Sequence, residues 1–212
     1  MSCDSATKQV VVGVSGASGA PYAVRLVQCL VEGGAAVHLV VTPYGRRLLR
    51  DELGLAEVSA ESLLGGESRL LTIHPCGDVG DALASGSFRT DGMIICPCSS
   101  NTLAAVATGI ADNLLTRAAA VTLKESRRLI LVPREMPTSR IDLRNMLRLS
   151  EAGAIICPAS PGFYMLPASV ADLVDFVVGK LLDLLDVPHA LNTRWADQIA
   201  GSQTAADADS AA

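Results

Sequence analysis

Aromatic side chains are scarce in this chain: its 212 residues include one tryptophan, three tyrosines and three phenylalanines. Charged residues are also few, at 18%, whereas half of the residues are hydrophobic. This profile is typical of an α/β enzyme rich in valine, leucine and alanine. The formal net charge of −5 argues against a general nucleic-acid surface, although it leaves room for a small basic pocket.

Long hydrophobic runs are missing as well. The longest, such as residues 129–132 with their flanks, are far shorter than the ~20 residues that span a bilayer. Residues 1–9 lack the apolar core of a secretory signal. We therefore expect no membrane contact. Because the mean hydropathy is nevertheless positive, at +0.37, we expect extra apolar surface to be covered in a homo-oligomer.

The six cysteines have no pattern of a disulfide framework, in a chain long enough to bury a full core. We therefore expect a reducing, cytoplasmic setting. Cys96-Pro97-Cys98 is not a C-x-x-C motif, and no second pair or histidine cluster completes a metal site. The sequence predicts packed thiols at a strand end, and no metal.

The chain length suits a single domain, which we place at residues 9–196. Residues 1–8 are expected to form a flexible N-terminus, and the Ala-, Asp- and Ser-rich residues 197–212 a disordered tail. Within the domain, short apolar runs alternate with helical patterns. Strands are expected to begin at Val10 and to cover 36–41, 70–73, 91–96, 129–132 and 154–157, and helices to cover 20–31, 44–53, 102–108, 114–124, 139–149 and 168–185.

This alternation predicts an α/β fold: a doubly wound parallel sheet with helices on both faces, in a three-layer arrangement that is Rossmann-like or flavodoxin-like.

The stretch from Val10 to Tyr22 begins this fold with a valine run, a loop of glycine, serine and alanine, and a helix start. Such a loop lets a phosphate approach the backbone N–H groups of the first helical turn. Ser15 and Ser18 add hydroxyl donors. The spacing Gly13-x-x-Gly16-x-x-Gly19 departs from the dinucleotide fingerprint and favours a mononucleotide such as FMN; the alternative is an ordinary tight turn.

Polar residues recur where the predicted strands end. They are Ser15 and Ser18, Thr42, Ser99 to Thr102, Arg134 with Glu135, and the loop that carries Tyr164. In a parallel sheet these ends share one edge, so we expect the groups to converge there. Hydroxyl and amide groups, helix starts and a few fixed charges suit a phosphorylated, planar ligand.

Several motifs in order resemble the flavin prenyltransferases of the UbiX family, over residues 10 to 195. They are Gly16-Ala17-Ser18-Gly19, Cys96-Pro97-Cys98-Ser99, Ala105-Val106-Ala107-Thr108-Gly109, Leu131-Val132-Pro133-Arg134-Glu135, Pro161-Gly162-Phe163-Tyr164 and Val174-Asp175-Phe176-Val177-Val178. The resemblance implies a cytosolic, commonly dodecameric enzyme that needs no metal. Such enzymes join a dimethylallyl group to reduced FMN at N5 and C6. The donor is dimethylallyl monophosphate or pyrophosphate, and the product is the prenylated FMN that UbiD-family decarboxylases use.

The resemblance also implies the site residues. It assigns flavin binding to Gly16, Ala17, Ser18, Thr42, Ser99, Ser100, Asn101, Thr102 and Arg134. It assigns the prenyl phosphate to Tyr164, Lys180, Lys124 and Arg117, and the wall near the prenyl chain to Trp195. Catalytic roles fall to Ser18 near flavin N5, to Glu52 and Glu135 near the reacting centre, and to Lys124. Lys180 stands where several relatives carry arginine, which keeps the cation but loses its bidentate fork.

The chemistry leaves alternatives open. Ring closure requires a base to take a proton from C6, and either Glu135 or the released phosphate can serve. Cys98 is a possible nucleophile without a basic partner in the sequence, and neither His38 nor His74 has a nucleophile or metal partner there. Two other functions compete: an FMN-dependent cysteine decarboxylase, since residues 97–102 resemble its Asn-Thr flavin motif, and an FMN-binding accessory subunit without chemistry of its own. No Met-Asn-x-x-Met-Trp substrate segment of the decarboxylase is present.

Overall fold

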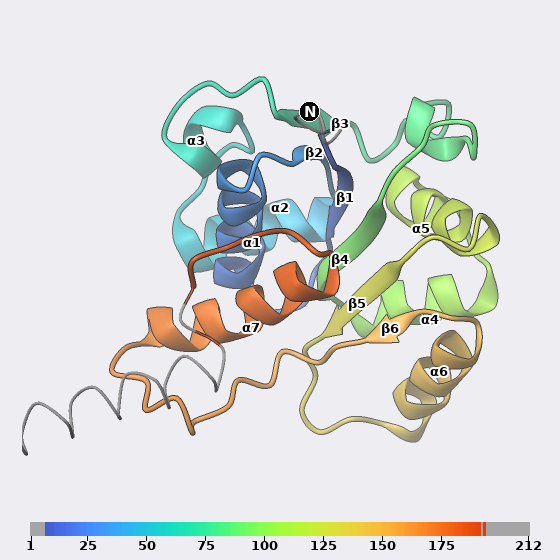
Figure 1. Cartoon of the computed structure of the whole chain (residues 1–212). Helices are drawn as coiled ribbons and strands as arrows, with labels where there is room; N and C mark the ends of the chain where they lie inside the picture. The colour runs from blue at the N-terminus through green and yellow to red at the C-terminus, as the bar shows by residue number, and fades with distance from the viewer. Residues whose placement is uncertain (1–6, 192, 194–212) are drawn as a thin grey trace, which may run out of the picture.

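A computed structural model describes residues 7–191 and 193 of the chain (Figure 1). Its centre is a six-stranded parallel sheet in the order β3-β2-β1-β4-β5-β6. The strands are β1 (Gln9–Val14), β2 (Ala36–Val41), β3 (Leu71–His74), β4 (Gly92–Cys98), β5 (Leu129–Pro133) and β6 (Ile155–Ile156). The helices are α1 (Ala20–Glu32), α2 (Pro43–Leu53), α3 (Ala60–Leu64), α4 (Ser100–Thr108), α5 (Leu114–Lys124), α6 (Arg140–Glu151) and α7 (Val170–Leu184), with a 3₁₀ turn η1 (Ala82–Ala84).

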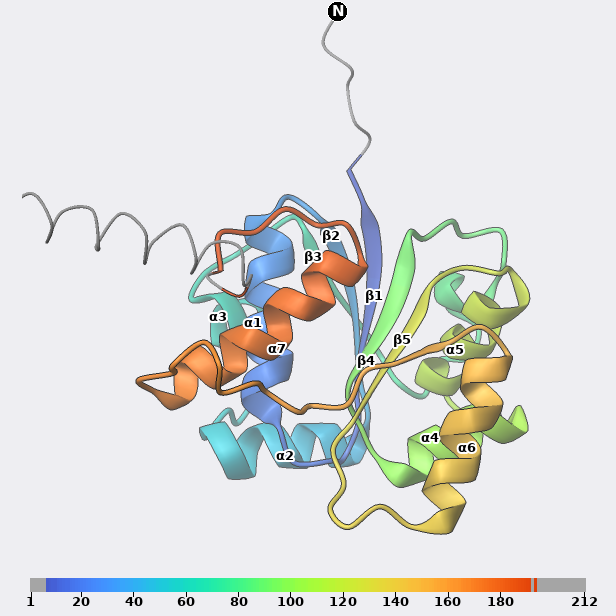
Figure 2. The same cartoon turned by 60° about the horizontal axis from the view of Figure 1, so that its bottom comes forward.

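The helices form two layers, one on each face of the sheet. Figure 2 shows the sheet nearly edge-on, with α1, α2, α3 and α7 on one side and α4, α5 and α6 on the other. Each layer closes its own apolar core: Leu26 of α1 and Leu181 of α7 belong to the first, Leu103 of α4 and Leu115 of α5 to the second. The predicted doubly wound, three-layer fold is confirmed.

Burial on both faces explains why the central strands form where the apolar runs lie. All seven residues of β4 and all five of β5 are buried, as expected for parallel strands covered by helices on both sides. The chain reverses its winding between β1 and β4, which are hydrogen-bonded neighbours although β2 and β3 lie between them in sequence. This is the topological switch point at which open α/β sheets bind ligands.

Several boundaries differ from the predictions. The last strand is shorter, because only Ile155 and Ile156 pair with β5. The strand expected at 91–96 continues to Cys98, with a cis peptide bond between Cys96 and Pro97. Helix α3 and turn η1 lie in a stretch for which the sequence predicted only a strand, and side-chain caps start both: Ser59 caps α3 and Asp81 caps η1.

Trp195, the expected tail at residues 197–212 and most of the expected N-terminal arm lie outside the described residues. Among the residues that the structure does describe, no helix is both long and apolar enough to cross a bilayer. In the same part of the chain, no group of three histidine, cysteine or acidic side chains is arranged to hold a metal ion.

Candidate functional site

A cavity of about 510 Å³ opens at the carboxyl ends of β1, β2 and β4, beside the switch point. This volume lies within the ordinary range for small-molecule sites. Five residues of the predicted flavin set line the cavity: Gly16, Thr42, Ser99, Asn101 and Thr102. They follow three different strands, so the expected convergence at this edge is present.

Besides the start of α2, where Thr42, Pro43 and Tyr44 line the wall, two helix N-termini lie at this cavity, those of α4 and α5. Ser99 caps α4 by accepting the Thr102 N–H at 3.3 Å, and Asn113 caps α5 by accepting the Thr116 N–H at 3.1 Å. Ser15 holds the start of α4 in place, because its hydroxyl accepts the Ser99 N–H at 2.8 Å and donates to the Pro97 carbonyl at 3.0 Å. The partial positive charge of both helix starts favours an anion in the cavity.

Glycine at position 16 allows the β1 loop to lie directly against α2. A Cβ atom at Gly16 would come within 2.5 Å of the Cβ of Tyr44, in the first turn of α2. That tyrosine is 73% exposed and lines the cavity. The wall of the cavity is therefore shaped by two residues that leave no space between them for a further carbon atom.

The N-terminus of α1 differs from the expectation that its N–H groups face a phosphate. The Glu52 carboxylate, at the end of α2, accepts the Gly19 N–H at 3.1 Å and the Ala20 N–H at 2.8 Å. These two donors are therefore taken by the protein itself and are not open to an anion. Glu52 and Gly19 are far apart in sequence, so no local sequence pattern predicts this contact.

We expect replacement of Glu52 by glutamine to destabilise the fold by about 1 kcal/mol, because two charge-assisted hydrogen bonds at a helix N-terminus become neutral ones. Chemical denaturation of wild type and variant measures this difference. Glu57→Gln is the matched control, since Glu57 is an exposed loop residue. Equal destabilisation by the two substitutions would contradict the role assigned to Glu52.

Arg134 and Glu135 connect three loops at the same edge. The Arg134 side chain donates from Nε to the Ser18 carbonyl at 3.2 Å, and Glu135 accepts from the Ser100 hydroxyl at 3.4 Å. The loops after β1, β4 and β5 therefore meet beside the cavity. Ser18, Ser100 and Arg134 are not among the residues that line the cavity.

Tyr164 packs against α7, the helix that also carries Lys180. The Tyr164 ring meets the Phe176 ring edge to face, with centroids 5.5 Å apart. Lys180 is one helical turn further along α7. Burial raises the pKa of the Cys157 thiol, and the nearby Lys180 charge opposes that shift, which places Lys180 beside the end of β6. Cys157 in turn donates its N–H to the carbonyl of Leu131 in β5, the strand that Arg134 follows.

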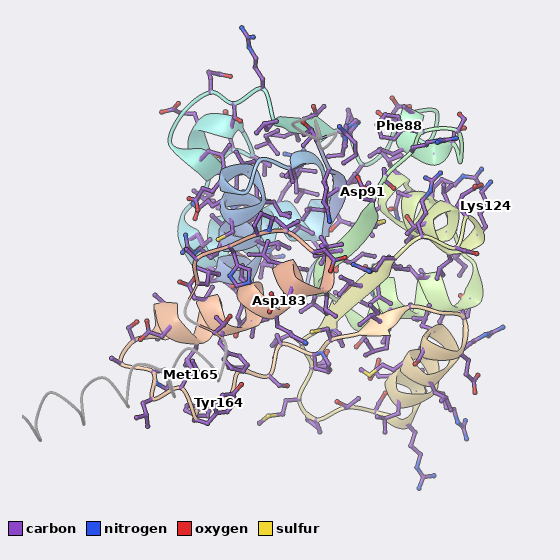
Figure 3. The ribbon with its side chains drawn as sticks, viewed as in Figure 1. Phe88, Asp91, Lys124, Tyr164, Met165 and Asp183 are labelled. Carbon is purple, nitrogen blue, oxygen red and sulfur yellow. The ribbon has the colours of Figure 1, made fainter. Side chains whose placement is uncertain are left out.

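Within one chain, Lys124 and Arg117 lie on α5, on the other face of the sheet from α7. Helix α5 starts at the cavity and runs away from it for 11 residues, or roughly 16 Å, and Lys124 is its last residue. Figure 3 shows Lys124 and Tyr164 on opposite sides of the molecule. Lys124 pairs with the exposed Glu125 at 3.7 Å, and Arg117 donates to the Ala84 carbonyl.

Cys98 is a packed thiol and no nucleophile. Its residue is 1% exposed, and burial raises its pKa to about 12. The thiolate is therefore a negligible species at neutral pH.

The cavity also has lining residues that the sequence did not indicate as ligand contacts, namely Tyr44, Cys76, Asp112, Asn113 and Thr116. The one available signal was the capping pattern at 112–113, which marked a second helix start at the same edge.

Comparisons with known proteins agree with this geometry. The model of the family described as Flavoprotein matches residues 2–182. The flavin prenyltransferase UbiX of Halalkalibacterium halodurans is 47% identical, over 88% of this chain and 93% of that protein.

Two solved structures are similar over most of the chain. One is AnUbiX (PadA1) in complex with FMN and dimethylallyl pyrophosphate; it is 39% identical, with a TM-score of 0.83, over 89% of this chain and 97% of that one. The other is a dodecameric, FMN-dependent Ubix-like decarboxylase from Escherichia coli O157:H7; it is 43% identical, with a TM-score of 0.80, over 88% of this chain and 98% of that one. On these matches, this chain belongs to the flavoprotein family and, within it, to the UbiX flavin prenyltransferases.

Proposed function

We propose that this protein transfers a dimethylallyl group from dimethylallyl phosphate to reduced FMN, at N5 and C6. The product is a prenylated FMN for a UbiD-type decarboxylase. The observation that carries this proposal is the meeting of three strand-end loops, through Arg134, Ser18, Ser100 and Glu135, beside a cavity lined by two helix starts. Membership of the UbiX family supports the same reaction.

The cavity residues fit FMN. The N-terminus of α4 would hold the phosphate, because Ser99, Asn101 and Thr102 of this helix start line the cavity and a helix N-terminus favours an anion. Gly16 lets the β1 loop lie flat against Tyr44, beside a planar ligand. Arg134, which donates to the Ser18 carbonyl, joins the loops after β1 and β5 and would help to hold the flavin there. Reduced FMN supplies the two nucleophilic positions.

Tyr164 and Lys180 form the proposed site for the phosphate of the prenyl donor. Breaking the allylic C–O bond leaves negative charge on the phosphate, and the Lys180 ammonium and the Tyr164 hydroxyl stabilise that charge as it develops. The aromatic pair of Tyr164 and Phe176 provides a wall that excludes water from the allylic cation. Mono- and pyrophosphate donors share this leaving-group chemistry.

We propose that Arg117 and Lys124 complete the site of a neighbouring subunit. Both are exposed cations of α5, which lies on the other face of the sheet from α7. An assembly of the dodecameric kind, as in the Escherichia coli relative, would bring such residues to another chain's site.

We also propose a cytoplasmic location. The five cysteines that the structure describes are free thiols, which supports it.

Replacement of Glu135 by glutamine is expected to slow ring closure while leaving FMN bound. Its carboxylate is exposed beside the Ser100 hydroxyl and is able to take the proton that leaves C6, a role typically worth ~100-fold or more in rate. Single-turnover absorbance spectra with reduced FMN and donor measure the step. Spectra that match wild type in rate would assign the proton to the released phosphate instead.

Release of inorganic phosphate tests the proposed reaction. We expect release only when the protein, reduced FMN and dimethylallyl monophosphate are all present under anaerobic conditions. Evolution of CO₂ from a peptide that ends in cysteine, without phosphate release, would favour the cysteine decarboxylase. Tight FMN binding without either product, and unchanged partner decarboxylase activity after Lys124→Ala and Lys180→Ala, would favour an accessory subunit.

A further inference from the structure

Two histidines without a role in the proposed reaction form a hydrogen-bonded chain at the β2–β3 edge of the sheet. His38 of β2 bonds through Nδ1 to Nε2 of His74, at the end of β3, over 3.0 Å. His74 Nδ1 bonds to the Asp81 carboxylate over 2.7 Å, and His38 Nε2 bonds to the Gln9 side chain over 2.9 Å. The ring of Phe88 meets the His38 ring edge-on, with centroids 5.0 Å apart.

This row of hydrogen-bonded side chains can hold only a limited number of protons. Asp81 only accepts, so His74 Nδ1 carries a hydrogen. One hydrogen then fits between the two rings, since either His38 or His74 donates to the other. Gln9 accepts from His38 or, with its amide turned, donates to it. All three hydrogen bonds therefore persist when both rings are neutral, and also when one ring is charged.

A second added proton breaks the hydrogen bond between the two histidine rings. With both rings charged, His38 Nδ1–H faces His74 Nε2–H, so a donor meets a donor at hydrogen-bond distance and two like charges adjoin. The side chains of His74 and Asp81 are only 12% and 15% exposed, so solvent screens this repulsion weakly. The rings have to separate, which releases the end of β3 from β2.

That end of β3 is also part of the flavin cavity. The bond from His74 to Asp81 closes the turn of residues 75–80, which contains the cavity residue Cys76. The Cys76 carbonyl accepts the N–H of Leu114, the first residue of α5, and its thiol donates to Asn113 Oδ1, 3.8 Å away. Asn113 lines the cavity as well. Separation of the histidines therefore loosens one wall of the cavity and the helix start beside it.

We propose that His38, His74 and Asp81 act as an acid-sensitive clamp on the flavin cavity, which holds the cavity wall at neutral pH and releases it in acid. The clamp rests on the proposed function, because its ligand is FMN. It adds a dependence on pH that the reaction itself does not require.

The groups around His38 determine in which direction the stability of the clamp changes with pH. Its pKa is lowered from 6.5, first by burial and then by the charge of His74, while Asp81 acts the other way. A lowered histidine pKa means that the folded protein binds fewer protons than the unfolded chain, so the stability due to the clamp is lost as pH falls below 6.5. The pKa of Asp81 is lowered from 3.8; burial opposes this shift, and hydrogen bonds from Leu83 and His74 outweigh it. Asp81 is therefore still ionised when the clamp opens.

The charged groups of the neighbouring elements have other partners. Helix α5 faces β2 with apolar residues; Arg117 bonds to Ala84, and Lys124 pairs with Glu125. Arg127, after α5, donates to the carbonyls of Gly86 and Phe88 and so holds the Phe88 ring in place. The charges that act on the His38 ring are thus those of His74 and Asp81.

FMN titration of the full-length protein between pH 7.5 and pH 5.5 tests the clamp. We expect wild type to lose about fivefold more affinity than His38→Asn over this range, since one proton changes affinity by at most about tenfold per pH unit. Asparagine keeps a hydrogen bond to His74 and does not titrate. The FMN phosphate, with a second pKa of about 6, titrates equally in both proteins and cancels. His189→Asn is the matched control, because His189 bonds to Asp183 away from the cavity.

A nitrogen-15 NMR titration of the histidine side chains gives a readout that a merely structural role would not move. The clamp predicts that His38 takes up its proton below pH 6.5 in wild type. Equal pH dependence of FMN affinity in wild type, His38→Asn and His189→Asn would overturn the clamp. Absence of FMN binding at pH 7.5 would overturn the proposed function instead.

Discussion

Replacement of Lys180 by alanine is expected to lower the rate of phosphate release by two to three orders of magnitude and to leave FMN affinity unchanged. Lys180 lies on the face of α7 that carries Phe176, one turn from the partner of Tyr164, and outside the flavin cavity. Loss of one preorganised group that stabilises developing negative charge typically costs about 100- to 1,000-fold in rate. The two measurements, phosphate release and FMN titration, separate the donor site from the flavin site.

The conservative variant sharpens this prediction. Lys180→Arg keeps the cation and restores the planar fork that binds phosphate at two points, so we expect activity close to wild type. Lys180→Met keeps the length of the side chain without its charge and is expected to behave as alanine does. An alanine variant within threefold of the wild-type rate would contradict the assignment of Lys180 to the leaving phosphate.

The second large effect is expected at Gly16. Alanine at this position brings its Cβ within 2.5 Å of the Cβ of Tyr44, an atom fixed to the α2 backbone that has no rotamer by which to move away. Overpacking of this kind costs about 1 to 3 kcal/mol, which corresponds to roughly a 5- to 150-fold loss of FMN affinity if the wall moves into the cavity. FMN titration by fluorescence measures it.

A double substitution distinguishes the clash from a general defect. Tyr44→Gly removes the opposing Cβ, so the combination of Gly16→Ala with Tyr44→Gly is expected to bind FMN better than Gly16→Ala alone. Gly66→Ala is the matched control, since a Cβ there meets nothing within 4 Å. If the double variant binds no better than Gly16→Ala, the close approach of the β1 loop to α2 does not shape the flavin site.

The strands and helices were predictable because their signals are local. The apolar runs that became β2 and β5 are buried on both faces, and capping residues such as Asn113 and Ser139 mark helix starts. Convergence at one edge followed from the parallel topology alone. This is why Thr42 and Ser99, far apart in sequence, were expected to share a site, and they do line one cavity.

Contacts between distant segments were out of reach of the sequence. Glu52, at the end of another helix, accepts two N–H groups at the N-terminus of α1, so these donors are not open to an anion as expected. His38 and His74 lack a visible partner in sequence and become partners only when β2 and β3 pair in register. The family resemblance assigned Lys124 to the prenyl phosphate, but a resemblance does not say on which side of the molecule a helix ends.

The mass of the flavin after anaerobic incubation with reduced FMN and dimethylallyl monophosphate tests the central claim most directly. Transfer of the C5H9 group with loss of one hydrogen from the flavin and release of phosphate predicts a gain of one C5H8 unit relative to reduced FMN. The gain should depend on the protein and on the donor. A flavin of unchanged mass, recovered from protein that binds both FMN and the donor, would contradict the account.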